Sequence, residues 1–364
     1  MATTISLFNH KGGVSKTTTT FNLGWALADA GYKVLLVDLD SQCNLTGIIL
    51  GYSKIDEGLD RFYESRTNLT LKTVVSQLID GISSDSILSN ESGNLFQTQN
   101  PNLFLLPGSL NISDMDSQIS IALKIAVGVP ATRNLPGALP RFIRDLAERE
   151  GFDFVLFDMS PNVGGLNEVM LMSSDYFIVP TSPDFFCWQA ISSLTEHLQN
   201  WHREINAFKQ TMPSRSSSAL TNRPIFLGTI QQRYRIRKQE PAKSFERWIS
   251  KIRSSVDTLL LPALQQIGCD LDKESVQKIL SNYPDRNGEQ LQAYDLSHIA
   301  DFNSLIAISQ NLSKPIFALT DQDLIDAKQF GFALQTMQES RNAFDTQFKR
   351  LSNVILRLTN TISQ

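Results

Sequence analysis

The sequence has few cysteines and no long apolar run, and both shortages exclude whole classes of protein. Cys43, Cys187 and Cys269 are far apart, so they offer neither a disulfide framework nor the ligand cluster of an iron–sulfur site. No apolar run approaches about 18 residues, and the N-terminus lacks a basic leader followed by an apolar segment. We therefore expect a cytoplasmic protein without a transmembrane segment.

The sequence also lacks a strong excess of charge. Lys and Arg together number 33 against 37 Asp and Glu, which gives a net charge of −4. The whole chain is therefore not basic enough to predict binding to nucleic acid, and such a prediction needs a local patch. With 364 residues, 41% hydrophobic residues, no internal repeat and no linker between separate cores, the chain favours one domain over residues 1–364.

A phosphate-binding loop is the clearest motif that the sequence does contain. The residues from Asn9 to Thr18, Asn-His-Lys-Gly-Gly-Val-Ser-Lys-Thr-Thr, follow the apolar run at residues 5–8 and precede a segment with helical spacing. A strand, a glycine-containing turn and a helix in this order direct backbone N–H groups and the helix N-terminus at an anion. The loop lacks the glycines of the general phosphate-loop pattern at His10 and Ser15.

Strand and helix patterns alternate along the chain. Two buried-type strands end in carboxylates, at Asp38 and at Asp158, and further apolar strands are predicted at residues 103–108, 176–180 and 225–230. This alternation predicts an α/β domain with a doubly wound, mostly parallel sheet flanked by helices. Besides the sheet, we expect a surface insertion at about 52–101, a basic and helical insertion at about 231–300, and a helical C-terminal region at about 321–362 with Thr320 or Asp321 as its N-cap.

Three ordered blocks resemble the ParA/MinD family of P-loop ATPases, and most closely the ParA/Soj-type partition ATPases. Residues 11–18 resemble the family's deviant Walker A loop, which has an extra lysine near its start, here Lys11. Residues 37–46 resemble its second aspartate box, and residues 157–161 resemble its Walker B element. The similarity is clear over roughly residues 1–50 and 150–235, and it extends less clearly to residues 103–114 and 302–319.

The resemblance implies the P-loop NTPase fold, ATP and Mg²⁺ as ligands, and a role for each motif residue. Lys16 neutralises the β- and γ-phosphates, Asp40 orients the attacking water, and Lys11 reaches the phosphates of a partner subunit in an ATP-bound homodimer. Thr17, Asp38 and Asp158 are the expected metal-site residues. The expected nucleotide contacts are Lys11, Gly12, Gly13, Val14, Ser15, Lys16, Thr17, Thr18, Pro180, Gln231, Gln232 and Arg233.

Some of these assignments have simpler alternatives. Lys11 taken alone is compatible with a solvated surface lysine, Pro180 with the end of a strand, and the polar residues from Gln231 to Arg233 with an ordinary loop. Ser15 stands where the family usually has glycine, and a non-glycine residue with positive φ costs roughly 1 kcal/mol or more. Such strain is compatible with slow hydrolysis. Ser41 and Cys43 replace the usual Pro and Gly of the second aspartate box.

A basic segment from Arg233 to Arg253 is the candidate for DNA binding. It has eight basic residues against Glu240 and Glu246, a local net charge of +6. Because nothing in it resembles a base-reading module, we expect contacts with phosphates without sequence preference. The alternative is a solvated helix face. The candidate DNA-contacting residues are Arg235, Arg237, Lys238, Lys243, Arg247, Lys251 and Arg253.

The resemblance as a whole implies a ParA-like switch. ATP assembles a sandwich dimer, the dimer binds nonspecific DNA, and a ParB-like or other partner stimulates hydrolysis to drive DNA segregation or cargo positioning, with the protein on the nucleoid. The alternatives are a MinD-like positioning ATPase on a membrane surface, or a switch that binds only another protein. Apolar residues at helical spacing from Phe348 to Ile362 fit either a membrane-surface helix or packing in the core or dimer, and we favour packing.

Overall fold

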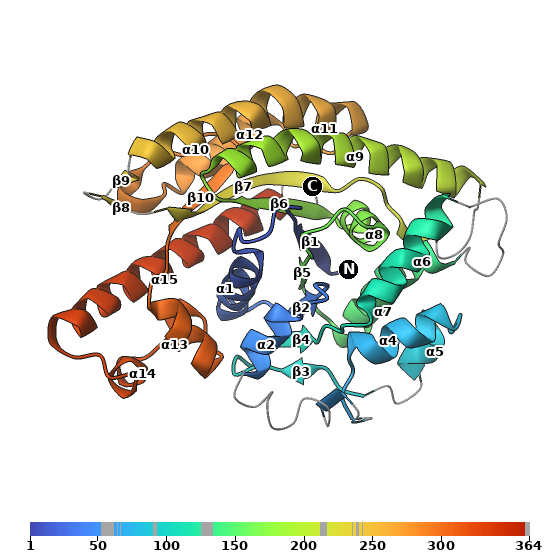
Figure 1. Ribbon diagram of the computed structural model, residues 1–364, viewed down its shortest axis with the longest axis horizontal. Coiled ribbons are helices and arrows are strands. Elements are labelled where there is room, and N and C mark those ends of the chain that lie inside the picture. The colour runs from blue at the N-terminus through green and yellow to red at the C-terminus, as the bar shows by residue number, and fades with distance from the viewer. Residues whose placement is uncertain are drawn as a thin grey trace.

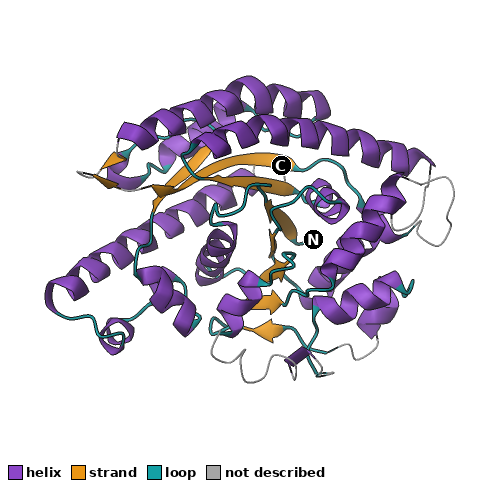
Figure 2. Ribbon diagram, in the orientation of Figure 1, coloured by secondary structure: helices purple, strands orange, loops and turns teal. Residues whose placement is uncertain are grey.

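The centre of the molecule is a single eight-stranded sheet. In the computed structural model, helices cover both of its faces (Figures 1 and 2). The strand order is β10-β7-β6-β1-β5-β2-β4-β3, and every neighbouring pair is parallel except β3 with β4. The strands are β1 (Thr3–Leu7), β2 (Val34–Asp38), β3 (Phe96–Gln97), β4 (Leu103–Leu106), β5 (Phe154–Asp158), β6 (Tyr176–Thr181), β7 (Ile225–Tyr234) and β10 (Asp295–Ala300).

The structure describes most, but not all, of the chain. The described residues are 1–51, 62, 63, 65, 67–89, 93–124, 134–211, 217–234, 236, 237, 240, 241 and 243–360. Two of the candidate DNA-contacting residues, Arg235 and Lys238, therefore lie outside the described residues, as do parts of the expected surface insertion and residues 361 and 362 of the C-terminal region.

The inner strands form where the sequence is continuously apolar. β2 and β5 are buried at every residue, as expected for parallel strands with helices on both faces. Asp38, the last residue of β2, pairs in register with Asp158, the last residue of β5, and Leu7 of β1 also pairs with Asp158. The phosphate loop and both carboxylates therefore meet at one edge of the sheet, which confirms the predicted α/β fold class.

The helices cover both faces of the sheet, and a further group of helices covers one end of it. Figure 1 shows α1 and α15 on one face, α6, α7 and α8 on the other, and α9 to α12 covering the β6–β7–β10 end. The helices are α1 (Lys16–Asp29), α2 (Asn44–Leu50), α4 (Leu71–Ile79), α5 (Ser84–Ser89), α6 (Ile112–Lys124), α7 (Leu135–Glu150), α8 (Gly165–Ser173), α9 (Phe185–Thr211), α10 (Lys243–Ser255), α11 (Leu261–Ile267), α12 (Lys273–Asn282), α13 (Leu305–Leu312), α14 (Asp321–Asp326) and α15 (Gly331–Asn360). Among the described residues, none of the helices is long and apolar enough to cross a membrane.

The minor elements complete the connections. A two-stranded hairpin, β8 (Ile236–Arg237) with β9 (Glu240–Pro241), follows β7 within the basic segment. A π-helical turn, η3 (Val256–Leu260), joins α10 to α11. Within the described ranges, short 3₁₀ turns are η2 (Ser217–Ala219), η4 (Arg286–Gly288) and η5 (Ile316–Ala318).

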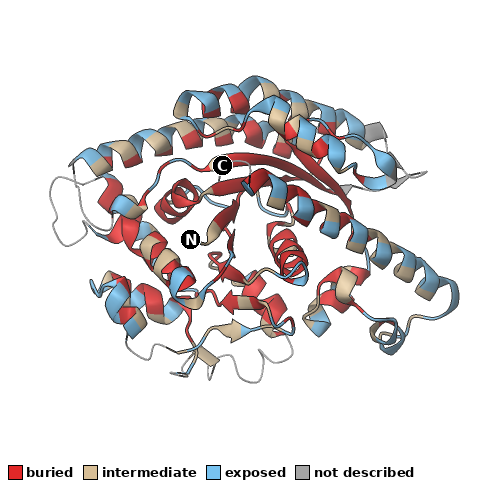
Figure 3. Ribbon diagram, turned by 180° about the vertical axis from the view of Figure 1, so that it is seen from behind, coloured by how far each residue is buried: buried red, intermediate tan, exposed pale blue. Residues whose placement is uncertain are grey.

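The C-terminal region consists of two helices rather than one. Thr320 is the N-cap of α14 in a reciprocal capping box with Asp323, and Lys328 has positive φ in the turn before α15. The second half of α15 buries Phe348, Leu351 and Leu358 in the main core, and Figure 3 shows the buried face. Packing in the core, which we favoured over a membrane-surface helix, is thus confirmed for this segment.

The interpretation of residues 231–300 as a basic and helical insertion is only partly correct. The segment also supplies β10, which completes the sheet at its edge. β10 has the sequence Asp-Leu-Ser-His-Ile-Ala. Because polar residues are interspersed with apolar ones in it, its hydropathy pattern does not predict a buried strand. Those polar groups have partners inside the fold: Arg253 donates to Asp295, and Asp285 accepts from the His298 backbone N–H at 2.9 Å.

Glu168 of α8 makes the stability of the fold depend on pH. Its side chain is 5% exposed, and burial, with a further contribution from Glu204, raises its pKa from 4.5 to about 8. The folded protein therefore keeps a proton that the unfolded chain releases above pH 4.5, so this contribution to stability is lost as pH rises from 4.5 to about 8.

We expect Glu168→Gln to remove this pH dependence, because the amide is neutral at every pH. The variant gains stability relative to the wild type by roughly 1–4 kcal/mol between pH 5 and pH 9. Urea denaturation of both proteins across this range measures the difference. A constant difference in the free energy of unfolding would contradict a buried, protonated Glu168.

Candidate functional site

The phosphate loop is a turn of fixed shape between β1 and α1. Asn9 is buried; its side-chain oxygen accepts from the Lys11 N–H, and its amide donates to the Pro180 carbonyl, both at 2.9 Å. Gly13 and Ser15 have φ of 73° and 58°. A turn with such residues directs successive backbone N–H groups inward, which is the geometry of an anion-binding nest. The loop thus has the shape expected of a phosphate cradle.

Lys16 lies inside the loop that it belongs to. Its side chain is buried, and its Nζ donates to the carbonyls of Asn9 at 2.9 Å and Lys11 at 3.3 Å. Burial lowers the pKa of the Lys16 ammonium, and the negative charges of Asp158 and Asp40 oppose that shift. The ammonium is therefore held at the floor of the loop, where it can exchange carbonyl partners for phosphate oxygens.

The carboxylate of Asp158 is buried without a hydrogen-bond partner among the described residues. Both of its oxygens are buried, and neither accepts a hydrogen bond of normal geometry from the described residues, although the Thr17 hydroxyl is close enough to lower its pKa. Burial and the charge of Asp38 nevertheless raise the pKa of Asp158 well above its usual value. A buried carboxylate beside a hydroxyl at a phosphate loop is a fitting place for Mg²⁺, which takes oxygen ligands.

The donor set fits a cation shared with a nucleotide. Among the described residues, no group of three or more His, Cys, Asp or Glu residues could hold a metal ion by itself. Mg²⁺ commonly binds to one or two protein oxygens together with phosphates and water. Thr17 and Asp158 match that pattern, and a bound cation would supply charge for phosphate oxygens there.

Asp38 and Asp40 have different partners. Asp38 accepts from the Thr46 N–H at 2.8 Å, the Thr46 hydroxyl at 2.7 Å and the Asp40 N–H at 3.2 Å. Its carboxylate thus holds the start of α2, and burial raises its pKa to about 6. Asp40 accepts from the Gln42 N–H at 3.0 Å and lines the cavity above the loop. Of the two, only Asp40 has a side chain at the cavity surface.

That cavity has a volume of about 430 Å³. Residues 12–18 form its floor, Asp40 and Pro161 lie at its sides, and Asp301, Phe302, Ile306 and Gln310 close it from the loop after β10 and from α13. Our sequence analysis did not identify Asp301 and Phe302 as site residues. The one signal for them was the weak family resemblance at residues 302–319, since they lie almost 300 residues from the loop.

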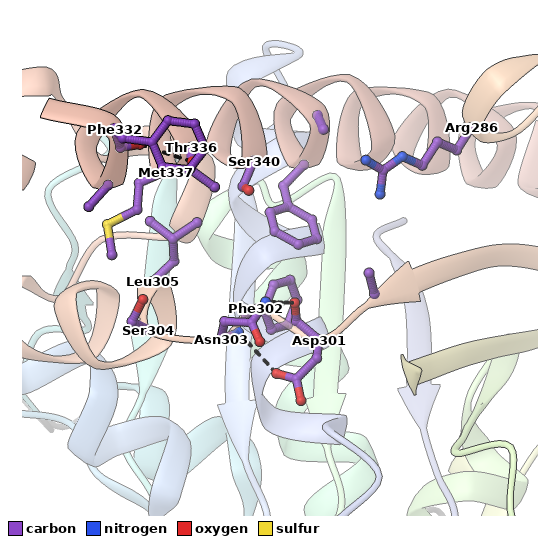
Figure 4. A pocket seen from close by; sticks show the side chains of 14 residues that line it. Arg286, Asp301, Phe302, Asn303, Ser304, Leu305, Phe332, Thr336, Met337 and Ser340 are labelled. Carbon is purple, nitrogen blue, oxygen red and sulfur yellow. Dashed lines mark hydrogen bonds between the residues drawn. The ribbon is translucent and has the colours of Figure 1, made fainter. Parts of the chain in front are cut away.

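A second cavity of about 580 Å³ shares Asp301 and Phe302 with the first. Figure 4 shows it between the loop after β10 and the first half of α15, with Phe332 and Met337 on one side and Arg286 on the other. Asn303 fixes this loop by donating to the Asp301 side chain at 3.0 Å and to its carbonyl at 3.1 Å. The loop after β10 is therefore a shared wall of two cavities.

Several of the expected nucleotide contacts do not line the cavity. Pro180, Gln231 and Gln232 do not line it: Gln231 accepts from the Thr181 hydroxyl at 2.8 Å, and Gln232 donates to Thr19 of α1. Both side chains are buried in these contacts. Arg233 lies in β7, and its side chain is outside the described part of the structure.

Lys11 makes contacts within its own chain. Its Nζ lies 2.6 Å from Asp184, just before α9, and 5.6 Å from the ring centre of Phe186. The pair is partly exposed, with 26% of the Lys11 side chain accessible, so its net contribution to stability is small. Lys11 is thus a residue of the loop that lies at the protein surface.

The described basic residues of α10 divide into two groups. Arg247 and Lys251 lie over tryptophan rings at the surface, whereas Arg253 pairs with the buried Asp295 and lies 3.0 Å from His298. This pairing makes Arg253 a structural residue and removes it from our candidate DNA contacts. For Arg237 and Lys243 the structure describes only the backbone, in β8 and α10.

The left-handed conformation of Ser15 leads to a testable prediction about stability. Its φ of 58° and ψ of 30° confirm the expected positive φ, and Cys43, the other replaced glycine, also has positive φ at 51°. We expect Ser15→Gly to stabilise the fold by about 0.5–1 kcal/mol, because relief of strain exceeds the entropy that glycine adds to the unfolded chain. Chemical denaturation measures this, with Ser15→Ala as the control that keeps the strain. Equal stability of the two variants would contradict it.

Comparisons with known proteins agree with this geometry. A family model described as an AAA domain matches residues 2–210. The cell division protein PomZ of Myxococcus xanthus is 30% identical over 198 residues, which are 54% of this chain and 52% of PomZ. The chromosome-partitioning ATPase Soj of Thermus thermophilus is 28% identical over 202 residues, which are 56% of this chain and 64% of Soj.

A solved structure has the same fold. The structure of pNOB8 ParA bound to nonspecific DNA superposes with a TM-score of 0.52 and 17% identity, covering 99% of each chain. The matches to curated relatives are shorter, because the chain spans only 52–60% of the length of the first four. Since the family model matches more than half of the chain, the chain belongs to this AAA domain family, among the ParA/MinD P-loop ATPases.

Proposed function

We propose that the protein is an ATPase that binds ATP with Mg²⁺ and hydrolyses it at the edge of the sheet described above. The observation that carries this proposal is the open Asp158 carboxylate beside Thr17 and Lys16. Lys16 binds the β- and γ-phosphates, Thr17 and Asp158 hold the cation, and Asp40 orients the attacking water from the side of the cavity. Asp38 positions Asp40 by accepting from its N–H, and it positions α2 through its bonds to Thr46.

The active form that we propose is a homodimer joined across this edge. Exposed apolar residues follow three strands there: Leu110 after β4 is 72% exposed, Val163 after β5 is 43% exposed, and Phe186 after β6 is 66% exposed. Large exposed apolar side chains at one edge are typical of an interaction surface. In this dimer, Lys11 leaves Asp184 and reaches the partner's phosphates.

The Lys11→Ala variant tests whether Lys11 stabilises the proposed dimer. We expect the variant to bind ATP but to form less dimer, because the charge that crosses the interface is lost. Static light scattering with a slowly hydrolysed ATP analogue measures the dimer fraction, and Lys33→Ala, a lysine far from the loop, is the control. A Lys11 variant that dimerises like the wild type would contradict this role.

The proposed binding partner of the dimer is nonspecific DNA. The support is the basic segment of α10, the chromosome-partitioning activity in the name of Soj, and the nonspecific DNA bound by the ParA neighbour. Binding through phosphates releases counterions, so its affinity falls steeply with salt. A partner protein of the ParB type would then stimulate hydrolysis and release, and the protein would reside on the nucleoid.

Gel-shift assays with ATP, ADP and no nucleotide test the DNA step. We expect ATP-dependent binding of a duplex of arbitrary sequence that weakens between low and moderate salt. Absence of binding at low salt with ATP would overturn the DNA step. The alternative is a positioning switch that binds only another protein. It predicts normal ATP turnover and no shift of the duplex in the gel.

A further inference from the structure

A cluster of aromatic rings, one of them exposed and two half-buried, lies where α9 begins and α10 passes beside it. We call Phe185, Trp188 and Trp248 the aromatic platform. The ring centres of Phe185 lie 5.8 Å from Trp188 and 5.9 Å from Trp248, and those of the two tryptophans lie 6.2 Å apart. Phe185 is 42% exposed. Trp188 also packs against the hydrophobic core, so the accessible part of the platform is the exposed ring of Phe185 and the half-buried ring of Trp248.

The platform is held in place and surrounded by cations. The Trp188 indole N–H donates to the Ser255 hydroxyl at 2.9 Å, which fixes the orientation of its ring. The Lys251 Nζ lies 4.5 Å from the ring centre of Trp188 and 4.9 Å from that of Trp248. Arg247 lies 5.9 Å from Trp248. Rings and positive charges therefore form one surface in the most basic segment of the chain.

We propose that the aromatic platform stacks with unpaired bases, so that single-stranded nucleic acid binds this surface more tightly than an intact duplex. This inference rests on the proposed nucleic-acid binding and names the form of the partner. Phosphate contacts need cations alone, whereas ring stacking needs bases that are free of a duplex. Rings that alternate with Lys and Arg are the composition of surfaces that bind single strands without sequence preference.

The platform is adjacent to the nucleotide loop. Phe185 contacts Phe186 at 5.6 Å, and Phe186 lies under the Lys11 ammonium. Phe186 thus belongs to the edge that we assign to the dimer, while the ring of Phe185 contacts Trp248 on α10. The main competing occupant of the platform is a second copy of the chain.

Fluorescence anisotropy with a labelled 20-nucleotide oligo(dT) and a matched 20-base-pair duplex, both with ATP, tests this inference. We expect the oligo(dT) to bind more tightly than the duplex. Phe185→Ala and Trp248→Ala weaken oligo(dT) binding by roughly 5- to 100-fold, which is the range for loss of one stacked base. Duplex affinity changes less than about twofold, because the phosphate contacts that set it remain. Phe332→Ala, which removes an 84% exposed ring on α15, is the matched control and changes neither.

The Trp248→Phe variant separates loss of stacking from a folding defect. It keeps an aromatic ring at this position, so it should retain most of the oligo(dT) affinity that Trp248→Ala loses. Equal affinity for both nucleic acids, or equal losses in the variants, would overturn the stacking inference while leaving duplex binding intact. Absence of binding to both would instead sink the proposed DNA function. If Trp248→Ala lowers the dimer fraction in light scattering without nucleic acid, the platform belongs to a contact between two copies.

Discussion

Lys16→Ala should abolish nucleotide binding, with the Kd for ATP rising by at least about 100-fold. Lys16 supplies the buried ammonium at the floor of the loop. Hydrogen bonds to charged groups contribute about 1.5–3 kcal/mol each, and loss of two of them accounts for this change. The loss is enlarged because Asp158 and Asp40 then face the phosphates without a compensating charge. Isothermal titration calorimetry with ATP and Mg²⁺ measures the affinity.

Two further variants separate a binding defect from a folding defect. Lys16→Met keeps the apolar stem of the side chain and removes only the ammonium, so it should fold and still fail to bind. Lys11→Ala removes the other lysine of the same loop, and we expect nearly unchanged ATP affinity in the monomer because Lys11 pairs with Asp184 at the surface. Tight ATP binding by folded Lys16→Met would show that this loop is not the phosphate site.

The sequence predicts the nucleotide side of the site well because its signals are local. The loop, Asp38 and Asp158 each follow an apolar strand within a few residues, and parallel strands bring such ends together at one edge. The register of Asp38 with Asp158 confirms this. The positive φ of Ser15 was likewise predictable, since it stands where related sequences have the one residue that adopts this conformation without strain.

The features that the sequence does not predict depend on distant contacts. β10 has polar residues that become buried only because Arg253 and Asp285 are folded against it, so no apolar pattern marks it. Asp301 and Phe302 reach the cavity because β10 is in the sheet. The aromatic platform combines residues about 60 positions apart on α9 and α10. Nothing in the sequence distinguishes Arg253 from the surface cations, because its partner Asp295 is 42 residues away in the chain.

Asp40→Ala should leave ATP binding intact and lower the rate of hydrolysis by at least about 100-fold, the usual contribution of a group that activates or orients the attacking nucleophile. Asp40 is the carboxylate that lines the side of the cavity, and its side chain accepts from the Gln42 N–H at 3.0 Å. Its removal therefore leaves the phosphate cradle and Asp158 unchanged. Phosphate release under saturating ATP measures the rate.

Asp40→Asn distinguishes chemistry from loop structure. The amide oxygen can still accept from the Gln42 N–H, so the segment before α2 keeps its shape, but the negative charge that polarises a water molecule is lost. We expect both variants to be equally slow and both to accumulate as ATP-bound dimers, because binding is retained while turnover is not. If Asp40→Asn hydrolyses ATP normally and only Asp40→Ala is slow, the role of Asp40 is to hold the segment through Gln42. Normal turnover in both variants would move the catalytic assignment to another residue of the cavity.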